Sequence, residues 1–507
     1  MNYNSMIKEK GTVRNHEGAK AYAMTTEMEL YTAVVTSALS DKFYESNNRR
    51  MERIASLIRQ ADPVFVAKLA VYTRTQMNLR SIPMFLIVEL AKIHNGDSLV
   101  KRTIGRCVLR ADEIMELLMC YQLRNSNGNG TKKLHKLSRQ VQEGLKDAFN
   151  RFDEYQFAKY NRSDLDVKLK DALFLVHPKA DNPGQQEIFN KIASDSLQPP
   201  YTWETQLSES GQKHFLTVEE KEAATKALWE ELIDSGKVGY MALLRNLRNI
   251  LDANVSLSHI EKVAAFISDP ANVAKSKQLP FRFFAAYKKL IGTKAKYSGC
   301  FSFALESAVA ASVANLKGFG PDTDVLVAAD VSGSMYTPVS PKSSVMCYDI
   351  GILLSMLLKS RCSSVISGMF GSTWKVLDLP QEDILANTIE MKARNGEVGY
   401  STNGYAVIDY LIENNIRMDK VMMFTDMQMW DSRFADKHLQ ASWNRYRQMY
   451  PGAKLYLFDL SGYGDAPVRL ASDDVTLIAG WSDKVFDVLN AIENGEDALA
   501  QINKIEI

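Results

Sequence analysis

The sequence predicts a largely helical first part followed by a doubly wound α/β sheet. Between about residues 21 and 317, apolar residues recur at helical spacing behind capping signals, whereas from residue 324 strand-length apolar runs alternate with helices. The charge also changes there: residues 321–507 hold 16 Lys and Arg against 25 Asp and Glu, a net of −9, and the remainder is +10. We expect a polar N-terminal arm at 1–20, a helical domain at 21–320 and an α/β domain at 321–507.

The composition excludes several protein classes. With 46% hydrophobic and 24% charged residues among 507, the chain is expected to fold into real cores rather than remain disordered. The first 20 residues lack the apolar core of a signal peptide, and no run approaches the roughly 18 apolar residues of a membrane span. The five cysteines are scattered and form no CxxC, which favours a reducing compartment and disfavours structural zinc. We therefore expect a cytoplasmic protein.

Helix starts in the first part carry recognisable caps. Asp62-Pro63 places an N-cap before a first-turn proline, and Ser81-Ile82-Pro83 begins a second helix. Thr217-x-x-Glu220 and Ser258-x-x-Glu261 are capping boxes. Short helices joined by short turns predict a HEAT-like α-solenoid, with a compact helical domain as the alternative because no single repeat period emerges.

The α/β part reads as strands and helices in alternation. The runs predict strands at 325–329, 365–370, 421–425, 455–458 and 475–478. Helices are expected at about 344–359 and 483–492, and a polar loop at 399–404 opens another at residue 405. This order indicates a doubly wound sheet.

The first of these strands ends in a polar motif. Asp330 closes the apolar run, and Ser332 and Ser334 follow with a glycine between them. Ligands of open α/β sheets sit beyond the carboxyl ends of strands, and hard oxygen donors suit a hard cation such as Mg²⁺. The alternative is an ordinary turn in which Asp and Ser bond the backbone.

Two later residues extend this motif. Thr402 lies in the 399–404 loop, and Asp426 follows the strand at 421–425. The order of Asp330, Ser332, Ser334, Thr402 and Asp426 resembles the metal-ion-dependent adhesion site of von Willebrand factor A domains. That resemblance implies a Rossmann-like domain in which these five residues hold a divalent cation, most simply Mg²⁺.

Basic residues with aromatics mark a candidate nucleic-acid surface in the helical part. Phosphate contact and base stacking on single-stranded RNA need this combination. The alternatives are a solvated helix face for Lys168 and Lys170, and a helix cap before Pro178 for His177. The candidate RNA-binding residues are Lys132, Lys133, Lys159, Arg162, Lys168, Lys170, His177 and Lys179.

Several strings resemble the Ro autoantigen family. They are His177-Pro178-Lys179-Ala180, Pro200-Tyr201-Thr202-Trp203-Glu204, Gly239-Tyr240-Met241-Ala242-Leu243-Leu244-Arg245-Asn246-Leu247-Arg248 and Leu279-Pro280-Phe281-Arg282-Phe283. Their order suggests a TROVE module (telomerase, Ro and vault proteins) followed by a von Willebrand factor A domain. The short arm and compact loops favour a bacterial-type Ro protein.

The Ro resemblance implies a function. Ro proteins close their helices into a ring, bind single-stranded 3′ ends of misfolded RNA in the basic hole, and bind small Y RNAs outside. Lys159, Arg162 and His177 fall in the stretch that matches the Y-RNA-contacting segment. A monomeric ring in RNA quality control or ribonucleoprotein tethering, with a 3′ exoribonuclease as a further partner, is the implied function.

Other function classes are weighed against this one. A metal-dependent protein-interaction scaffold is the main alternative, because a partner carboxylate can complete the coordination of a bound cation. A hydrolase is disfavoured, because the sequence contains no P-loop, HExxH, GxSxG or Cys–His pairing. We therefore expect no enzymatic activity. Salt-dependent RNA binding discriminates between the first two functions.

Overall fold

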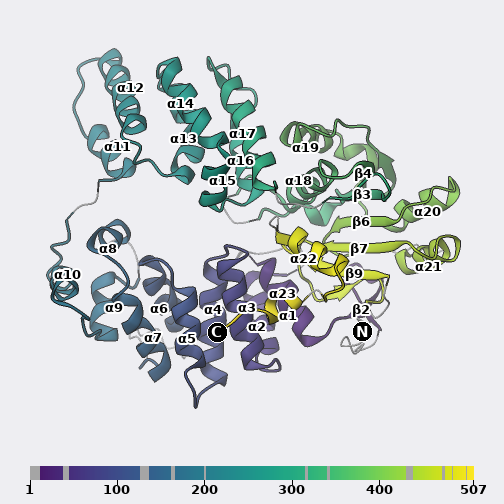
Figure 1. Cartoon of the computed structure of the whole chain (residues 1–507), viewed down its shortest axis with the longest axis horizontal. Coiled ribbons are helices and arrows are strands. Elements are labelled where there is room, and N and C mark those ends of the chain that lie inside the picture. The colour runs from purple at the N-terminus through teal and green to yellow at the C-terminus, as the bar shows by residue number, and fades with distance from the viewer. Residues whose placement is uncertain are drawn as a thin grey trace. The chain divides into compact units, whose positions relative to one another are not determined.

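The predicted order of a helical part and then a doubly wound sheet is confirmed (Figure 1). The computed structural model describes residues 12–37, 45–125, 136–161, 166–198, 201–314, 318–339, 343–429, 438–470, 474–481, 484–497 and 499–507. They form two compact units, one of Met1–Arg50 with Glu209–Ala500, the other of Met51–Ser208 with Gln501–Ile507. No described helix is both long and apolar enough to cross a membrane.

The unit of Met51–Ser208 is helical. Asp62 accepts a hydrogen bond from the Val64 N–H at 3.2 Å ahead of α3, which confirms the Asp-Pro start. The C-terminal segment belongs to this unit, since Lys68 Nζ donates to the Asn503 carbonyl at 2.6 Å. Its helices are α3 (Pro63–Thr75), α4 (Ser81–Ile93), α5 (Leu99–Cys107), α6 (Asp112–Asn125), α7 (Arg139–Phe149), α8 (Glu154–Tyr160), α9 (Leu169–Val176) and α10 (Pro183–Ala193). α2 (Asn47–Ile58) and α11 (Trp203–Gly211) cross the unit boundaries, and α23 (Ala500–Asn503) ends the chain's helices.

The other unit holds the remaining helices that precede the sheet. Thr217 caps α12 through the Glu220 N–H at 3.1 Å, as predicted. The second predicted capping box is wrong, because Glu230 accepts the Ser256 N–H at 2.8 Å and α14 therefore begins directly after Ser256. These helices are α1 (Thr26–Val35), α12 (Val218–Asp234), α13 (Tyr240–Asp252), α14 (Leu257–Ser268), α15 (Pro270–Ser276), α16 (Pro280–Leu290) and α17 (Ser298–Ser312).

The same unit contains a six-stranded sheet in the order β5-β4-β3-β6-β7-β9, parallel except for β5. Its central strands are apolar and buried on both faces, the pattern of a covered parallel sheet. Its strands are β3 (Asp324–Asp330), β4 (Ser364–Phe370), β5 (Trp374–Val376), β6 (Lys420–Thr425), β7 (Lys454–Asp459) and β9 (Val475–Ala479). The helices that alternate with them are α18 (Cys347–Lys359), α19 (Ile384–Ala393), α20 (Tyr405–Glu413), α21 (Leu439–Met449) and α22 (Lys484–Glu493).

The N-terminal segment packs on this α/β domain. β1 (Thr12–Arg14) and β2 (Lys20–Ala23) form a hairpin, and β2 pairs antiparallel with β8 (Asp465–Ala466). The Tyr31 hydroxyl donates to the Ala479 carbonyl at 3.1 Å, and Arg50 donates to the Ser461 carbonyl. Residues 12–20 of the predicted polar arm thus form a strand, a turn and the first residue of β2.

Candidate cation and nucleic-acid sites

Two buried aspartates meet at one edge of the sheet. Asp330 is the last residue of β3, and Asp426 directly follows β6. β3 and β6 are parallel neighbours, with Ala329 opposite Phe424, so both carboxylates lie at the carboxyl edge. Each side chain is 0% exposed. This is the position at which open α/β sheets bind ligands.

Hydrogen bonds fix the first carboxylate completely and the second only in part. Asp330 accepts from the Ser332 N–H at 2.8 Å and from the Thr425 hydroxyl at 2.6 Å, and the Ser332 and Ser334 hydroxyl oxygens lie 3.4 Å apart. Asp426 Oδ1 accepts from the Gln428 N–H at 3.1 Å, whereas Asp426 Oδ2 has no hydrogen-bond partner among the described residues. A buried carboxylate oxygen without a partner is costly and calls for a ligand.

The electrostatics of the pair favour a positive charge. Burial, and to a smaller extent the nearby Asp426 carboxylate, raise the pKa of Asp330 to about 7, although the hydrogen bonds from Ser332 and Thr425 oppose the rise. Burial is also the main cause that raises the pKa of Asp426 to about 6, although the nearby Ser334 hydroxyl and the Gln428 N–H oppose the rise. A bound cation would offset the desolvation cost and the mutual repulsion of the two ionised carboxylates.

The loop that carries Thr402 contacts the loop that follows β3. The Gly333 N–H donates to the Tyr400 carbonyl at 2.9 Å, and the Asn403 N–H donates to the Gly371 carbonyl at 2.8 Å. Thr402 is 4% exposed in this loop, but no hydrogen bond joins it to the other four predicted ligands within the described ranges. The structure thus gathers Asp330, Ser332, Ser334 and Asp426, with the Thr402 loop against them.

The donor set fits a hard cation. No three His, Cys, Asp or Glu side chains gather as a metal-binding group in the part of the chain that is described. A cation at this edge must therefore rely on two carboxylates, hydroxyl oxygens and water, which is the donor set that Mg²⁺ accepts. Sequence reasoning missed Thr425, although its place beside Asp426 at a strand end was a usable signal.

The predicted RNA-binding residues lie mainly on and near α8 and α9. Lys132, Lys133 and Arg162 fall outside the described residues. Lys159 is exposed on α8, with its ammonium 5.8 Å from the Tyr155 ring centre and 5.7 Å from that of Tyr160. Lys168 is exposed, whereas Lys170 pairs with Asp195 at 2.7 Å.

His177 combines a backbone cap with an exposed side chain. It is the C-cap of α9 at φ 50°, and its N–H donates to the Leu173 carbonyl at 2.9 Å, so the capping interpretation is right for the backbone. Its imidazole and the Lys179 side chain are exposed. Lys159, Lys168, His177 and Lys179 are therefore exposed on this segment, whereas Lys170 is held in an ion pair with Asp195.

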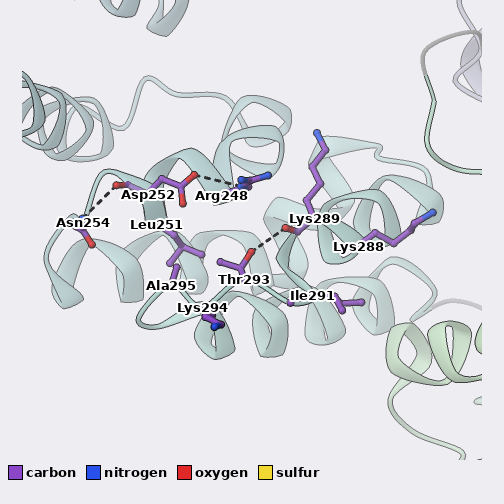
Figure 2. Close-up of a pocket in the computed structure, with 11 residues that line it drawn as sticks. Arg248, Leu251, Asp252, Asn254, Lys288, Lys289, Ile291, Thr293, Lys294 and Ala295 are labelled. Atoms are coloured by element: carbon purple, nitrogen blue, oxygen red, sulfur yellow. Dashed lines mark hydrogen bonds and ion pairs between the residues drawn. The ribbon is translucent and has the colours of Figure 1, made fainter.

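A basic cavity that the sequence did not single out lies between α13, α16 and the loop after α16 (Figure 2). It encloses about 690 Å³ and is lined by Arg248, Lys288, Lys289 and Lys294. Arg248 lies 3.5 Å from Asp252, and Lys288 bonds the Ser344 carbonyl at 2.7 Å and Asp349 at 3.3 Å. Lys289 and Lys294 are exposed and have no ion pair among the described residues.

Two arginines on the same helices add to this charge. Arg245 of α13 and Arg282 of α16 are exposed, and neither has a carboxylate partner in the described part of the chain. Partial desolvation of the Arg282 guanidinium lowers its pKa although the residue is largely exposed, and the nearby charge of Arg245 lowers the pKa further, so the two guanidinium groups repel each other. We call Arg245, Arg248, Arg282, Lys289 and Lys294 the α13–α16 basic cluster. Arg245 and Arg248 stand three apart within the Ro-like string, a spacing that places both on one helix face.

Comparisons with known proteins agree with this architecture. The chain is 25% identical over 338 residues to telomerase protein component 1 of Rattus norvegicus and 24% identical over 314 residues to that of Mus musculus. These matches cover 52% and 47% of the chain but only 12% and 11% of those longer proteins. The crystal structure of the Deinococcus radiodurans Ro (RSR) protein superposes with a TM-score of 0.60 at 17% identity, covering 93% of this chain and all of that one. It shares the fold.

A family match covers most of the helical part. The TROVE domain matches residues 12–199 and 195–299, which include α13, α16 and the α13–α16 basic cluster. The predicted resemblance is confirmed, and the chain belongs to the TROVE family.

Proposed function

We propose that this chain is a non-catalytic RNA-binding protein of the Ro type. The observation that carries the proposal is the α13–α16 basic cluster, which lies within the TROVE-matched residues. Arg248 lies 3.5 Å from Asp252, but the other four cations of the cluster have no carboxylate partner among the described residues. Like charges held close together repel one another, and a polyanion relieves that repulsion. Phosphates of a nucleic acid supply that charge and release counterions on binding.

Single-stranded RNA is the form that this cluster suits best. Three of its cations, those of Arg248, Lys289 and Lys294, line a cavity of about 690 Å³. The exposed Arg282 guanidinium lies 4.9 Å from the centre of the buried Phe281 ring. Guanidinium groups offer stacking surfaces to splayed bases, while lysines follow the phosphates. We assign single-stranded ends to this cluster.

The α8–α9 segment is assigned to a different RNA. Lys159, between two tyrosines, and the exposed His177 offer phosphate contact and stacking to a structured RNA, as the Ro resemblance implies for Y-type RNA. Action in cytoplasmic RNA quality control, alongside a 3′ exoribonuclease, completes the proposal.

The strand-end site is proposed to hold Mg²⁺ in a domain of the von Willebrand factor A type. Asp330, Ser332, Ser334 and Asp426 would supply or orient the oxygen ligands, with Thr402 from the adjoining loop. A bound cation supplies positive charge that neutralises two buried carboxylates. This site favours the second candidate function, a metal-dependent protein-interaction scaffold in which RNA binding is secondary.

A salt titration of the full chain tests the RNA proposal. We expect the triple change Arg245→Ala, Arg282→Ala and Lys289→Ala to weaken binding of a single-stranded oligoribonucleotide, measured by fluorescence anisotropy. The slope of log K against log salt should fall by roughly 0.7 for each lost contact, about 2 in total.

The matched control removes the same charge elsewhere. Lys375, Arg394 and Arg417 lie on the α/β domain and each already pairs with a carboxylate, at 2.5, 3.0 and 3.1 Å. Changing all three to Ala should leave the slope unchanged. Equal behaviour of the two triple variants would remove the α13–α16 basic cluster from the proposal, and absence of salt-dependent binding in the wild type would favour the scaffold.

A further inference from the structure

Two tyrosines are exposed beside the carboxyl edge of the sheet. Tyr336 directly follows the 3₁₀ turn η2 (Gly333–Met335) and is 37% exposed, and Tyr400 lies in the loop that carries Thr402 and is 57% exposed. Their ring centres are 5.9 Å apart at an interplanar angle of 75°, which is an edge-to-face pair. The two rings therefore form one aromatic surface, which we call the tyrosine pair.

The backbone around the tyrosine pair is held by hydrogen bonds. The Gly333 N–H donates to the Tyr400 carbonyl at 2.9 Å, and the Gly333 carbonyl accepts the Tyr336 N–H at 3.2 Å, so one residue positions both tyrosines. Beyond Tyr400, the Ser401 N–H donates to Ser372 Oγ at 3.2 Å. Side chains that are positioned before a ligand arrives lose less conformational entropy on binding, which favours a preformed contact surface.

An ion-pair cluster lies beside the tyrosine pair. The buried Tyr348 of α18 packs on Tyr336 with ring centres 4.6 Å apart, and the Lys392 ammonium lies 5.1 Å from the Tyr348 ring centre. Lys392 and Lys288 approach the two oxygens of the Asp349 carboxylate at 3.1 and 3.3 Å. Because two ammonium groups share one carboxylate, the three groups together carry a net positive charge.

Lys288 connects this cluster to the basic cavity. It lines the cavity of about 690 Å³ together with Arg248, Lys289 and Lys294 (Figure 2). One side chain therefore belongs both to the wall of the cavity and to the ion pairs beside the tyrosine pair. Single-stranded RNA uses both features, because its phosphates contact cations and its splayed bases stack on aromatic rings.

We propose that the tyrosine pair is a base-stacking site for single-stranded RNA that is held by the α13–α16 basic cluster. The inference rests on the proposed RNA-binding function and adds a second contact surface, on the α/β domain. The phosphates stay with the cations, while bases further along the strand stack on the exposed surfaces of Tyr336 and Tyr400. This contact tolerates many sequences, because every base has a face that can stack.

The test compares the double variant Tyr336→Leu and Tyr400→Leu with wild type in the full chain. Fluorescence anisotropy would use an oligoribonucleotide of about 16 nucleotides, the upper site size of single-strand-binding folds. Affinity should fall roughly 5- to 150-fold for each base that loses its ring. The slope of log K against log salt should stay unchanged, because no charge is removed. Tyr336→Phe with Tyr400→Phe keeps both rings and should bind as the wild type does.

A second probe separates stacking from charge. An oligonucleotide of the same length without bases keeps the phosphates, so the wild type and the double Leu variant should bind it equally and more weakly than the natural RNA. An equal fold-loss of the variant on both probes would overturn the stacking role. Tyr400→Leu alone changes the more exposed ring, and it should lose part of the affinity for natural RNA even if the double variant does not fold.

Tyr450→Leu is the matched control. Tyr450 is half-buried between α21 and β7, at the opposite edge of the same sheet, and its replacement should leave RNA affinity unchanged. A folded double Leu variant that binds RNA like the wild type would leave the exposed rings to a protein partner and overturn this inference alone. A wild-type chain that binds no RNA would overturn the RNA-binding function together with it.

Discussion

The strand-end edge and the α8–α9 segment differ in how well the sequence predicts the surroundings of their candidate site residues. At the edge, Asp330 and Asp426 are 96 positions apart, yet adjacent parallel strands bring both to one place. On α8 and α9 the predicted residues are close in sequence, yet Lys159 lies between tyrosines, Lys170 pairs with Asp195 and His177 caps a helix. Sheet topology brings distant side chains to one edge, whereas side chains that are close in sequence on α8 and α9 have different partners and exposure.

The sharpest test of the edge is Asp330→Asn, and it carries the largest expected effect. Mg²⁺ at about 100 times its Kd should stabilise the wild type by about 2.7 kcal/mol, and the variant should lose all of this because a carboxylate ligand is gone. Thermal unfolding with and without Mg²⁺ measures both. Asp349→Asn changes a buried carboxylate on α18 that pairs with Lys288 and Lys392, and it should keep the Mg²⁺ response. An equal Mg²⁺-dependent rise in Tm in the wild type and in Asp330→Asn would show that Asp330 is not a ligand of the cation.

The second test uses pH in the presence of EDTA. The folded-state pKa of Asp330 is raised to about 7 and that of Asp426 to about 6, so the folded chain binds more protons than the unfolded chain between about pH 4 and 7. The free energy of unfolding contributed by these two groups should therefore fall as pH rises through that window, visible as a Tm that is several degrees lower at pH 8 than at pH 5.

Two controls accompany the pH scan. Saturating Mg²⁺ should flatten the fall, because the cation takes over from the protons as the carboxylates ionise. Asp330→Asn should also show a shallower fall in EDTA. A Tm that does not change between pH 5 and 8 in EDTA, in either protein, would mean that ionisation of Asp330 and Asp426 does not destabilise the fold.

A third change addresses the helical segment. Lys159→Ala, Arg162→Ala and His177→Ala together remove up to three phosphate contacts, so binding of a structured small RNA should weaken roughly tenfold, or about 1.4 kcal/mol. Binding of a short single-stranded 3′ tail should weaken less. Gel-shift titrations of both RNAs at one salt concentration compare the losses, and equal losses would mean one shared surface.

The smallest effect is expected at Lys170. Its ammonium already pairs with Asp195 at 2.7 Å on the surface, so Lys170→Ala should change stability by less than about 1 kcal/mol and leave RNA affinity nearly unchanged. Lys168 is exposed at the N-cap of the same helix, and Lys168→Ala is the control that should weaken RNA binding measurably. A larger RNA effect at Lys170 than at Lys168 would place the contact on the paired face.

These differences explain how far the sequence could predict the molecule. Strands at 325–329, 421–425 and 455–458 were predictable because uninterrupted apolar runs of that length fit a covered parallel sheet. Short β5 and β8 were not, since three and two residues carry too little pattern, and their pairing depends on tertiary neighbours. The start of α14 was misplaced because Glu230, on another helix, fixes Ser256.

Some residues of the candidate sites could be predicted from the sequence, and others could not. The four edge residues were named from the strand-end motif, because strand ends fix where side chains meet. Thr425 was missed, although it directly precedes the predicted ligand Asp426 and its hydroxyl donates to Asp330. The α13–α16 basic cluster was missed because it joins two helices and a loop across about 50 residues.

Contacts between segments that are more than 400 residues apart in sequence have a consequence for folding during translation. Contacts of Asn15 and Arg50 reach partners 414 and 411 positions later, and those of Lys68 and Arg102 reach partners 435 and 405 positions later. At roughly 5–20 residues per second, translation leaves these first-made segments waiting roughly 20–80 s for their partners. The apolar residues of β2 and α1 are exposed during that interval, so these segments of the growing chain are prone to aggregation until their partners are made.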